Sequence, residues 1–115
     1  YKENASSANA TYYKEGVFTK EAAETIRDDL IQVVENPGGT AHSAQIEGKT
    51  IAGKTGTAEI KDSKDDTEGT EIGWFNAFTV NETDENSRLI ISMVENVKGK
   101  GGSHYLLPKV KAILE

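Results

Sequence analysis

The chain has 115 residues, which is the length of one small domain or of part of a larger one. Its 13 Lys plus Arg against 19 Asp plus Glu give a net charge of −6, which argues against a general nucleic-acid or anionic-membrane binder. The absence of Cys excludes disulfides, thiolate metal sites and a Cys nucleophile. Because the chain begins at Tyr1 rather than Met, we expect a processed product or an excised piece.

The first half is predicted to hold one amphipathic helix. Residues 1–16 are polar and without periodicity, so we expect a loop there. Thr19 suits an N-cap, and apolar residues recur every three or four positions after it, which predicts a helix over 19–35. The helix should end at Asn36–Gly39, because this stretch holds a Pro and two Gly.

The second half reads as strands followed by a helix. Alternating and β-branched residues predict strands over 50–60, 71–80 and 88–94, joined by short polar loops typical of antiparallel neighbours. A helix is predicted over 103–114, with Pro108 in or near its first turn. The expected fold class is therefore α+β: a three-stranded antiparallel meander within 50–97, with an N-terminal and a C-terminal helix packed on it.

The second strand carries aromatic residues on both of its faces. Trp74 falls on one face and Phe75 on the other, so both faces of the sheet need a cover. If both helices cover one face, the other is uncovered. We expect apolar surface from Ile72, Trp74 or Phe75 to make the isolated chain self-associate.

One motif in the first strand has two interpretations. Gly48–Thr55 formally matches GxxxxGK[ST], the pattern of a phosphate-binding loop. Thr50, Ile51 and Ala52 suit an extended strand better than a loop around phosphates, and Gly56 would weaken the helix that the pattern requires. Nucleotide binding is therefore the third hypothesis.

The alternative interpretation is a strand that binds its ligand along one edge. Side chains alternate faces on a strand, so Lys54 and Thr55 present an ammonium and a hydroxyl at neighbouring points. Gly56 leaves room for a ligand backbone, which can pair with free strand amides. The N–H of Thr57 is suited to donate to an oxyanion.

The sequence KTGTAE at 54–59 resembles the KTG element of penicillin-binding proteins and serine β-lactamases, and most closely that of class B penicillin-binding proteins. Further features follow in the family's order: Gly73-Trp74-Phe75, the strand from Leu89, Gly101-Gly102, and Pro108. The resemblance covers about residues 17–115 and, more finely, is to the low-affinity type of Gram-positive bacteria. It implies that the whole of 1–115 is a single incomplete domain, the C-terminal portion of a transpeptidase domain.

The family resemblance implies a D,D-transpeptidase that cross-links peptidoglycan by serine acyl transfer and binds β-lactams. Lys54 would supply positive charge near the serine of an SxN motif, and the hydroxyls of Thr55 and Thr57 would bind the carboxylate of the stem peptide or β-lactam. The Thr57 N–H would be half of an oxyanion hole, and Gly56 would permit close approach. Glu59 has two interpretations, a residue at the cleft rim or a solvated strand position. No cofactor, metal or nucleic acid is expected.

The chain departs from the family pattern at the nucleophile. No Ser is followed three positions later by Lys, so the SxxK motif is absent and these residues alone are expected to be inactive. Ser7-Ala8-Asn9 matches SxN only formally, since it lies 45 residues before Lys54. The resemblance implies a place at the outer face of the cytoplasmic membrane, through an N-terminal anchor outside these residues. A β-lactam receptor's sensor domain is the alternative parent.

Overall fold

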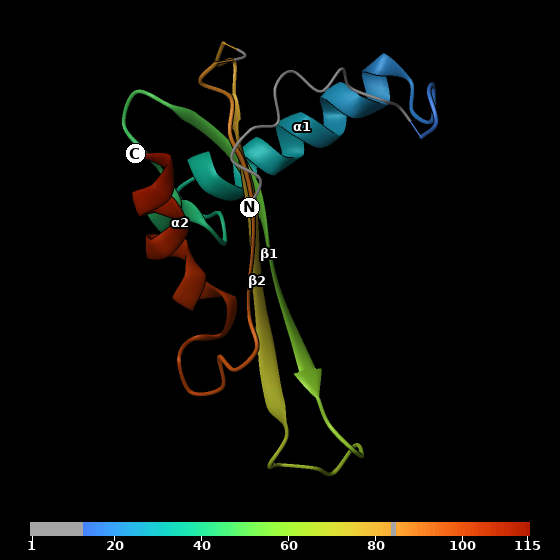
Figure 1. The fold of residues 1–115 in the computed structure, drawn as a ribbon, viewed down its shortest axis with the longest axis vertical. Helices are drawn as coiled ribbons and strands as arrows, with labels where there is room; N and C mark the ends of the chain where they lie inside the picture. Colours follow the sequence, from blue (N-terminus) through green and yellow to red (C-terminus); the bar gives the residue numbers. More distant parts are fainter. Residues whose placement is uncertain (1–12, 84) are drawn as a thin grey trace, which may run out of the picture.

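The computed structural model describes residues 13–83 and 85–115 (Figure 1). Its elements follow one another in this order: α1 (Lys20–Glu35), the 3-10 helix η1 (His42–Ala44), β1 (Thr50–Ile60), β2 (Thr70–Val80), β3 (Leu89–Val94), the 3-10 helix η2 (Gly102–Leu106) and α2 (Leu107–Leu114). Most of the loop expected over 1–16 lies outside the described residues.

A local sequence signal fixes the start of α1 but not that of α2. Thr19 caps α1, and its Oγ1 accepts the N–H of Ala22 at 3.1 Å. The helix predicted over 103–114 begins later than expected, because the chain first forms η2 and becomes α-helical only at Leu107. Pro108 then falls in the first turn of α2, where its missing N–H has no partner to lose.

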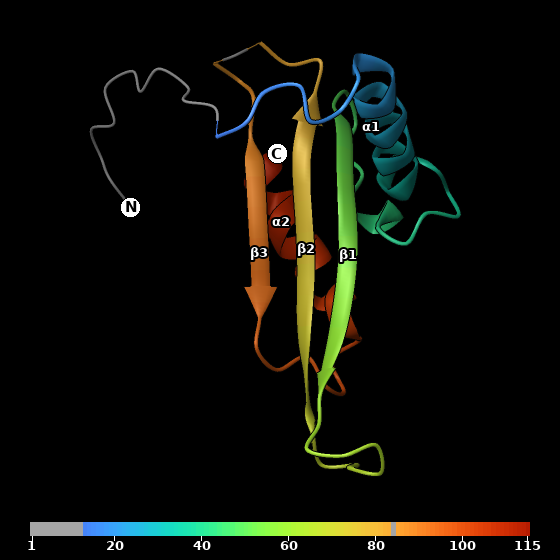
Figure 2. The same ribbon diagram turned by 90° about the vertical axis from the view of Figure 1, so that its right-hand side faces the viewer.

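The sheet is an antiparallel meander in the order β1-β2-β3, as Figure 2 shows face-on. Lys54 lies opposite Asn76 on β2, and Phe75 lies opposite Ser92 on β3. Among the described residues no strand pairs with the outer edge of β1 or of β3. The predicted α+β class and the three-stranded antiparallel sheet are confirmed.

One face of the sheet carries the core. Helix α2 and η2 lie against this face, whereas α1 lies beside β1 and extends away on the other side of the sheet, so the two helices do not cover the same face (Figures 1 and 2). Phe75 is fully buried here. The core also contains side chains from both α-helices, both 3-10 helices, β1, β2 and the segments next to η1: Val34, Ala41, Ala44, Ile46, Ile51, Ala77, Leu106, Leu107, Val110 and Leu114.

The opposite face is largely uncovered by the described residues. Trp74 is 38% exposed, and Ile91 and Leu89 on β3 are each 67% exposed. Lys54, Asn76 and Ile91 lie in register across this face. Of the three residues expected to expose apolar surface, Trp74 is exposed on this face and Ile72 is half-buried. The expectation was wrong for Phe75, because the alternation of β2 turns Phe75 into the core.

Candidate functional site

The outer edge of β1 offers free backbone groups. The N–H of Ile51 points outward, because it donates to the Glu35 carboxylate at 2.9 Å rather than to β2. Groups on alternate residues of a strand point the same way, so the N–H groups of Thr55 and Thr57 point outward too. The Thr55 carbonyl also points outward, since it accepts a hydrogen bond from the Lys54 ammonium at 2.7 Å rather than from β2. An extended ligand therefore has a row of backbone partners along this edge.

The two threonine side chains point to the core side of the sheet, whereas Lys54 lies on the other side. Thr55 Oγ1 lies 3.2 Å from Thr40 Oγ1, and Thr57 Oγ1 accepts the N–H of Ser103 at 3.1 Å. The sequence interpretation missed Thr40 and Ser103. They lie 15 and 46 residues from their partners, and no local pattern links them.

Two glycines allow the segment before α2 to reach Thr57. Gly73 lies opposite Thr57 on β2, and a Cβ on Gly73 would come within 3.0 Å of Val97 and 3.3 Å of the Ser103 Cα. Gly102 has a φ of +61°, and a Cβ there would lie 3.1 Å from Thr57 Oγ1. A side chain at Gly102 would therefore crowd the Thr57 hydroxyl directly, whereas a side chain at Gly73 would push away the segment that carries Ser103.

Gly56 is not required by the fold itself. A Cβ at this position would meet only the Trp74 Cβ, at an ordinary contact distance of 3.7 Å. The predicted role of Gly56, room for a ligand backbone, is therefore compatible with the geometry and stays a prediction. Glu59 lies further along β1, exposed, and pairs with the Lys61 ammonium at 2.7 Å. This hydrogen bond raises the pKa of Lys61.

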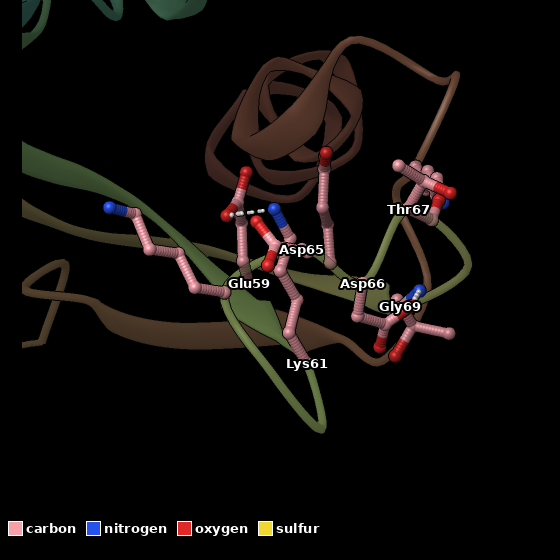
Figure 3. Close-up of a pocket in the computed structure, with 10 residues that line it drawn as sticks. Glu59, Lys61, Asp65, Asp66, Thr67 and Gly69 are labelled. Atoms are coloured by element: carbon pink, nitrogen blue, oxygen red, sulfur yellow. Dashed lines mark hydrogen bonds and ion pairs between the residues drawn. The ribbon is translucent and has the colours of Figure 1, made fainter.

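The loop that joins β1 to β2 is organised by one carboxylate, Asp66 (Figure 3). Asp66 accepts backbone N–H groups of Asp62, Glu68 and Gly69 at 3.1, 2.7 and 3.1 Å. These bonds favour the charged form and lower the pKa of Asp66. The loop borders an open hollow of about 480 Å³ with side chains of both charges. Within 13–83 and 85–115, no group of three or more His, Cys, Asp or Glu is placed to hold a metal ion.

The phosphate-loop interpretation finds no support in this geometry. Gly53, Lys54 and Thr55 lie within β1, which runs on to Ile60, so no helix opens at Thr55. A phosphate-binding loop needs curled backbone amides and a helix N-terminus at that point.

The site can thus be described as an edge strand with outward amides, two hydroxyls and an ammonium. The model of the penicillin-binding protein transpeptidase domain matches residues 1–115, and the chain belongs to this family. It is 45% identical, over 106 residues, to penicillin-binding protein 3 of Bacillus subtilis (strain 168), covering 91% of this chain and 15% of that protein. The chain therefore spans about a seventh of the curated relative it matches, and the predicted class B penicillin-binding protein resemblance is confirmed.

None of the helices in the described part of the chain is both long and apolar enough to span a bilayer.

Proposed function

We propose that this chain forms the strand wall of the active site of a D,D-transpeptidase that cross-links peptidoglycan by serine acyl transfer and binds β-lactams. The observation that carries the proposal is the outward N–H of Thr57, which sits on the same edge as two hydroxyls held at fixed places. A tetrahedral intermediate formed beside β1 would find a rigid donor there for its oxyanion.

The other groups of the strand bind the ligand or supply charge. Thr55 and Thr57 hydroxyls bind the carboxylate of the stem peptide or β-lactam, and Gly56 lets the ligand backbone approach. Lys54 supplies positive charge on the opposite side of the strand, where the serine of an SxN motif from another part of the protein would lie. Glu59, already paired with Lys61, serves as a solvated strand position or at the rim of the cleft.

The nucleophile comes from residues outside this chain in the proposal, since no SxxK occurs within 1–115. The parent protein acts at the outer face of the cytoplasmic membrane and is anchored there by a segment outside 1–115. The sensor domain of a β-lactam receptor would use the same strand wall to bind without turnover. Cytoplasmic signalling residues in the parent sequence would favour that alternative.

Fluorescent penicillin labelling tests the proposal. We expect no covalent labelling of the 115-residue chain, and labelling of a longer piece of the parent protein that begins about 250 residues further upstream. Replacing the SxxK serine of this longer piece by Ala should abolish its labelling. Covalent labelling of residues 1–115 alone, or no labelling of the longer piece in its native form, would contradict the proposal.

The isolated chain is also predicted to self-associate through the face that carries Trp74, Leu89 and Ile91, because the described residues leave this apolar surface open. Light scattering should show concentration-dependent association, and Ile91→Lys should weaken it. Ile113→Lys is the matched control: Ile113 is 70% exposed, against 67% for Ile91, but lies on α2 on the other side of the sheet. A compact monomer at high concentration, without binding of a dye for apolar surface, would count against this face.

A further inference from the structure

Thr40 stands beside the KTG strand on a turn of fixed shape. The turn follows α1 and is bound to it, with the N–H of Ala41 donating to the Val33 carbonyl at 3.0 Å. Ala41 is fully buried, and a Cβ on Gly39 would lie 2.3 Å from the same carbonyl oxygen. The turn therefore packs closely against the helix end, and Thr40, although exposed, is held at a defined place.

The hydroxyl protons at this edge can be counted. Thr40 and Thr55 share one hydrogen bond at 3.2 Å, so one of their two protons is used and one is left. Thr57 Oγ1 accepts from the Ser103 N–H, so the Thr57 proton is not used in that bond. The hydroxyls of Thr40, Thr55 and Thr57 therefore leave two protons free for a ligand. One carboxylate can accept both, one on each of its two oxygens.

We propose that Thr40 is a positioning residue for Thr55: it donates its proton to Thr55 Oγ1, which directs the Thr55 proton at the bound carboxylate. An anion next to Thr55 selects this direction, because Thr55 can donate to the anion only if Thr40 is the donor within the pair. A chain of two hydroxyls that ends on a charged acceptor is stronger than separate bonds, since each bond polarises the next. This inference rests on the proposed carboxylate-binding role of Thr55.

The Ser103 amide acts on Thr57 in the same way. A backbone N–H can only donate, so the oxygen of Thr57 serves as acceptor and its proton is left for the ligand. Both threonines of the strand therefore have a donor behind them, Thr40 for one and Ser103 for the other.

The test compares two β-lactam probes on the full-length protein that contains this chain: benzylpenicillin, which carries the carboxylate, and its methyl ester, which does not. We expect Thr40→Val to slow acylation by benzylpenicillin by roughly 2- to 10-fold, the effect of one weakened hydrogen bond. The reaction with the ester should change much less. Thr40→Ser restores the hydroxyl and should restore the rate, and Ser43→Ala, an exposed hydroxyl on the next turn, is the control.

The outcomes separate this inference from the proposed function. Equal slowing with both probes, no slowing at all, or failure of Thr40→Ser to restore the rate would overturn the role of Thr40. In each case a carboxylate-selective loss in Thr55→Val would leave the proposed function standing. If Thr55→Val also affects both probes equally, the carboxylate site itself is wrong. Thermal unfolding of each variant shows that the comparison is made on folded protein.

Discussion

Thr57→Pro is expected to slow β-lactam acylation of the full-length protein by about 10²- to 10³-fold relative to Thr57→Val, the loss typical of one oxyanion donor. Both substitutions remove the hydroxyl, so their comparison isolates the backbone N–H of residue 57. The N–H points away from β2 by the parity that Ile51 sets, so Pro removes no bond of the sheet. The preceding Gly56 is already extended, as a residue before Pro prefers.

Glu59→Pro is the matched control for this experiment. Residue 59 lies two positions after Thr57 on β1, so its N–H also points outward. It is, however, beyond the proposed oxyanion position. Glu59→Gln is its reference, because both variants lack the Glu59 carboxylate, which pairs with Lys61. We expect Glu59→Pro to be acylated within about threefold of the rate of Glu59→Gln, against the much larger loss between Thr57→Val and Thr57→Pro. Equal losses in Thr57→Pro and Glu59→Pro would mean that Pro disturbs the whole edge, and the assignment of the Thr57 N–H would be lost.

The KTGTAE strand was recognisable from sequence because everything it needs is local. Residues 54–59 alternate along one strand, so the separation of Lys54 from the two threonine hydroxyls follows from their order alone. The bounds of the strands were close for the same reason: predicted limits of 71–80 and 88–94 compare with Thr70–Val80 and Leu89–Val94.

Thr40 and Ser103 could not be found in this way. Each reaches the strand through a turn whose path depends on close packing, at Gly39 against α1 and at Gly73 beneath Ser103. In the sequence these glycines read only as breakers or as weak points in a strand. Each glycine lets a neighbouring segment come closer than a Cβ would allow. The sequence does not show which segment that is, so this role is seen only in the structure.

The adjacent aromatics Trp74 and Phe75 set a different limit on prediction. Alternation places them on opposite faces, but the sequence does not say which face the helices cover. The structure turns Phe75 into the core and leaves Trp74 38% exposed. The choice between the two faces depends on where η2 and α2 pack, and this packing joins residues that are far apart in the sequence.

Phe75→Ala is therefore expected to destabilise the isolated chain by about 3–5 kcal/mol, the usual loss for a buried Phe. Because small domains are stable by only about 5–15 kcal/mol, this variant should be close to unfolded. Trp74→Ala should cost no more than about 2 kcal/mol, since part of the ring is already in contact with solvent. Urea unfolding followed by circular dichroism measures both, because Trp74 is the one Trp and fluorescence would be lost with it.

The measurement is best made in the Ile91→Lys background, where weaker self-association keeps the unfolding reaction close to unimolecular. If the free energy of unfolding falls equally in the two variants, or falls more in Trp74→Ala, the core does not lie on the face of β2 that carries Phe75. The full-length protein gives a second comparison. If other parts of the transpeptidase domain cover the face with Trp74, Trp74→Ala should lower the free energy of unfolding more there than in the isolated chain. The loss caused by Phe75→Ala should stay the same. The difference between the two hosts therefore measures how much of Trp74 is buried by residues outside this chain.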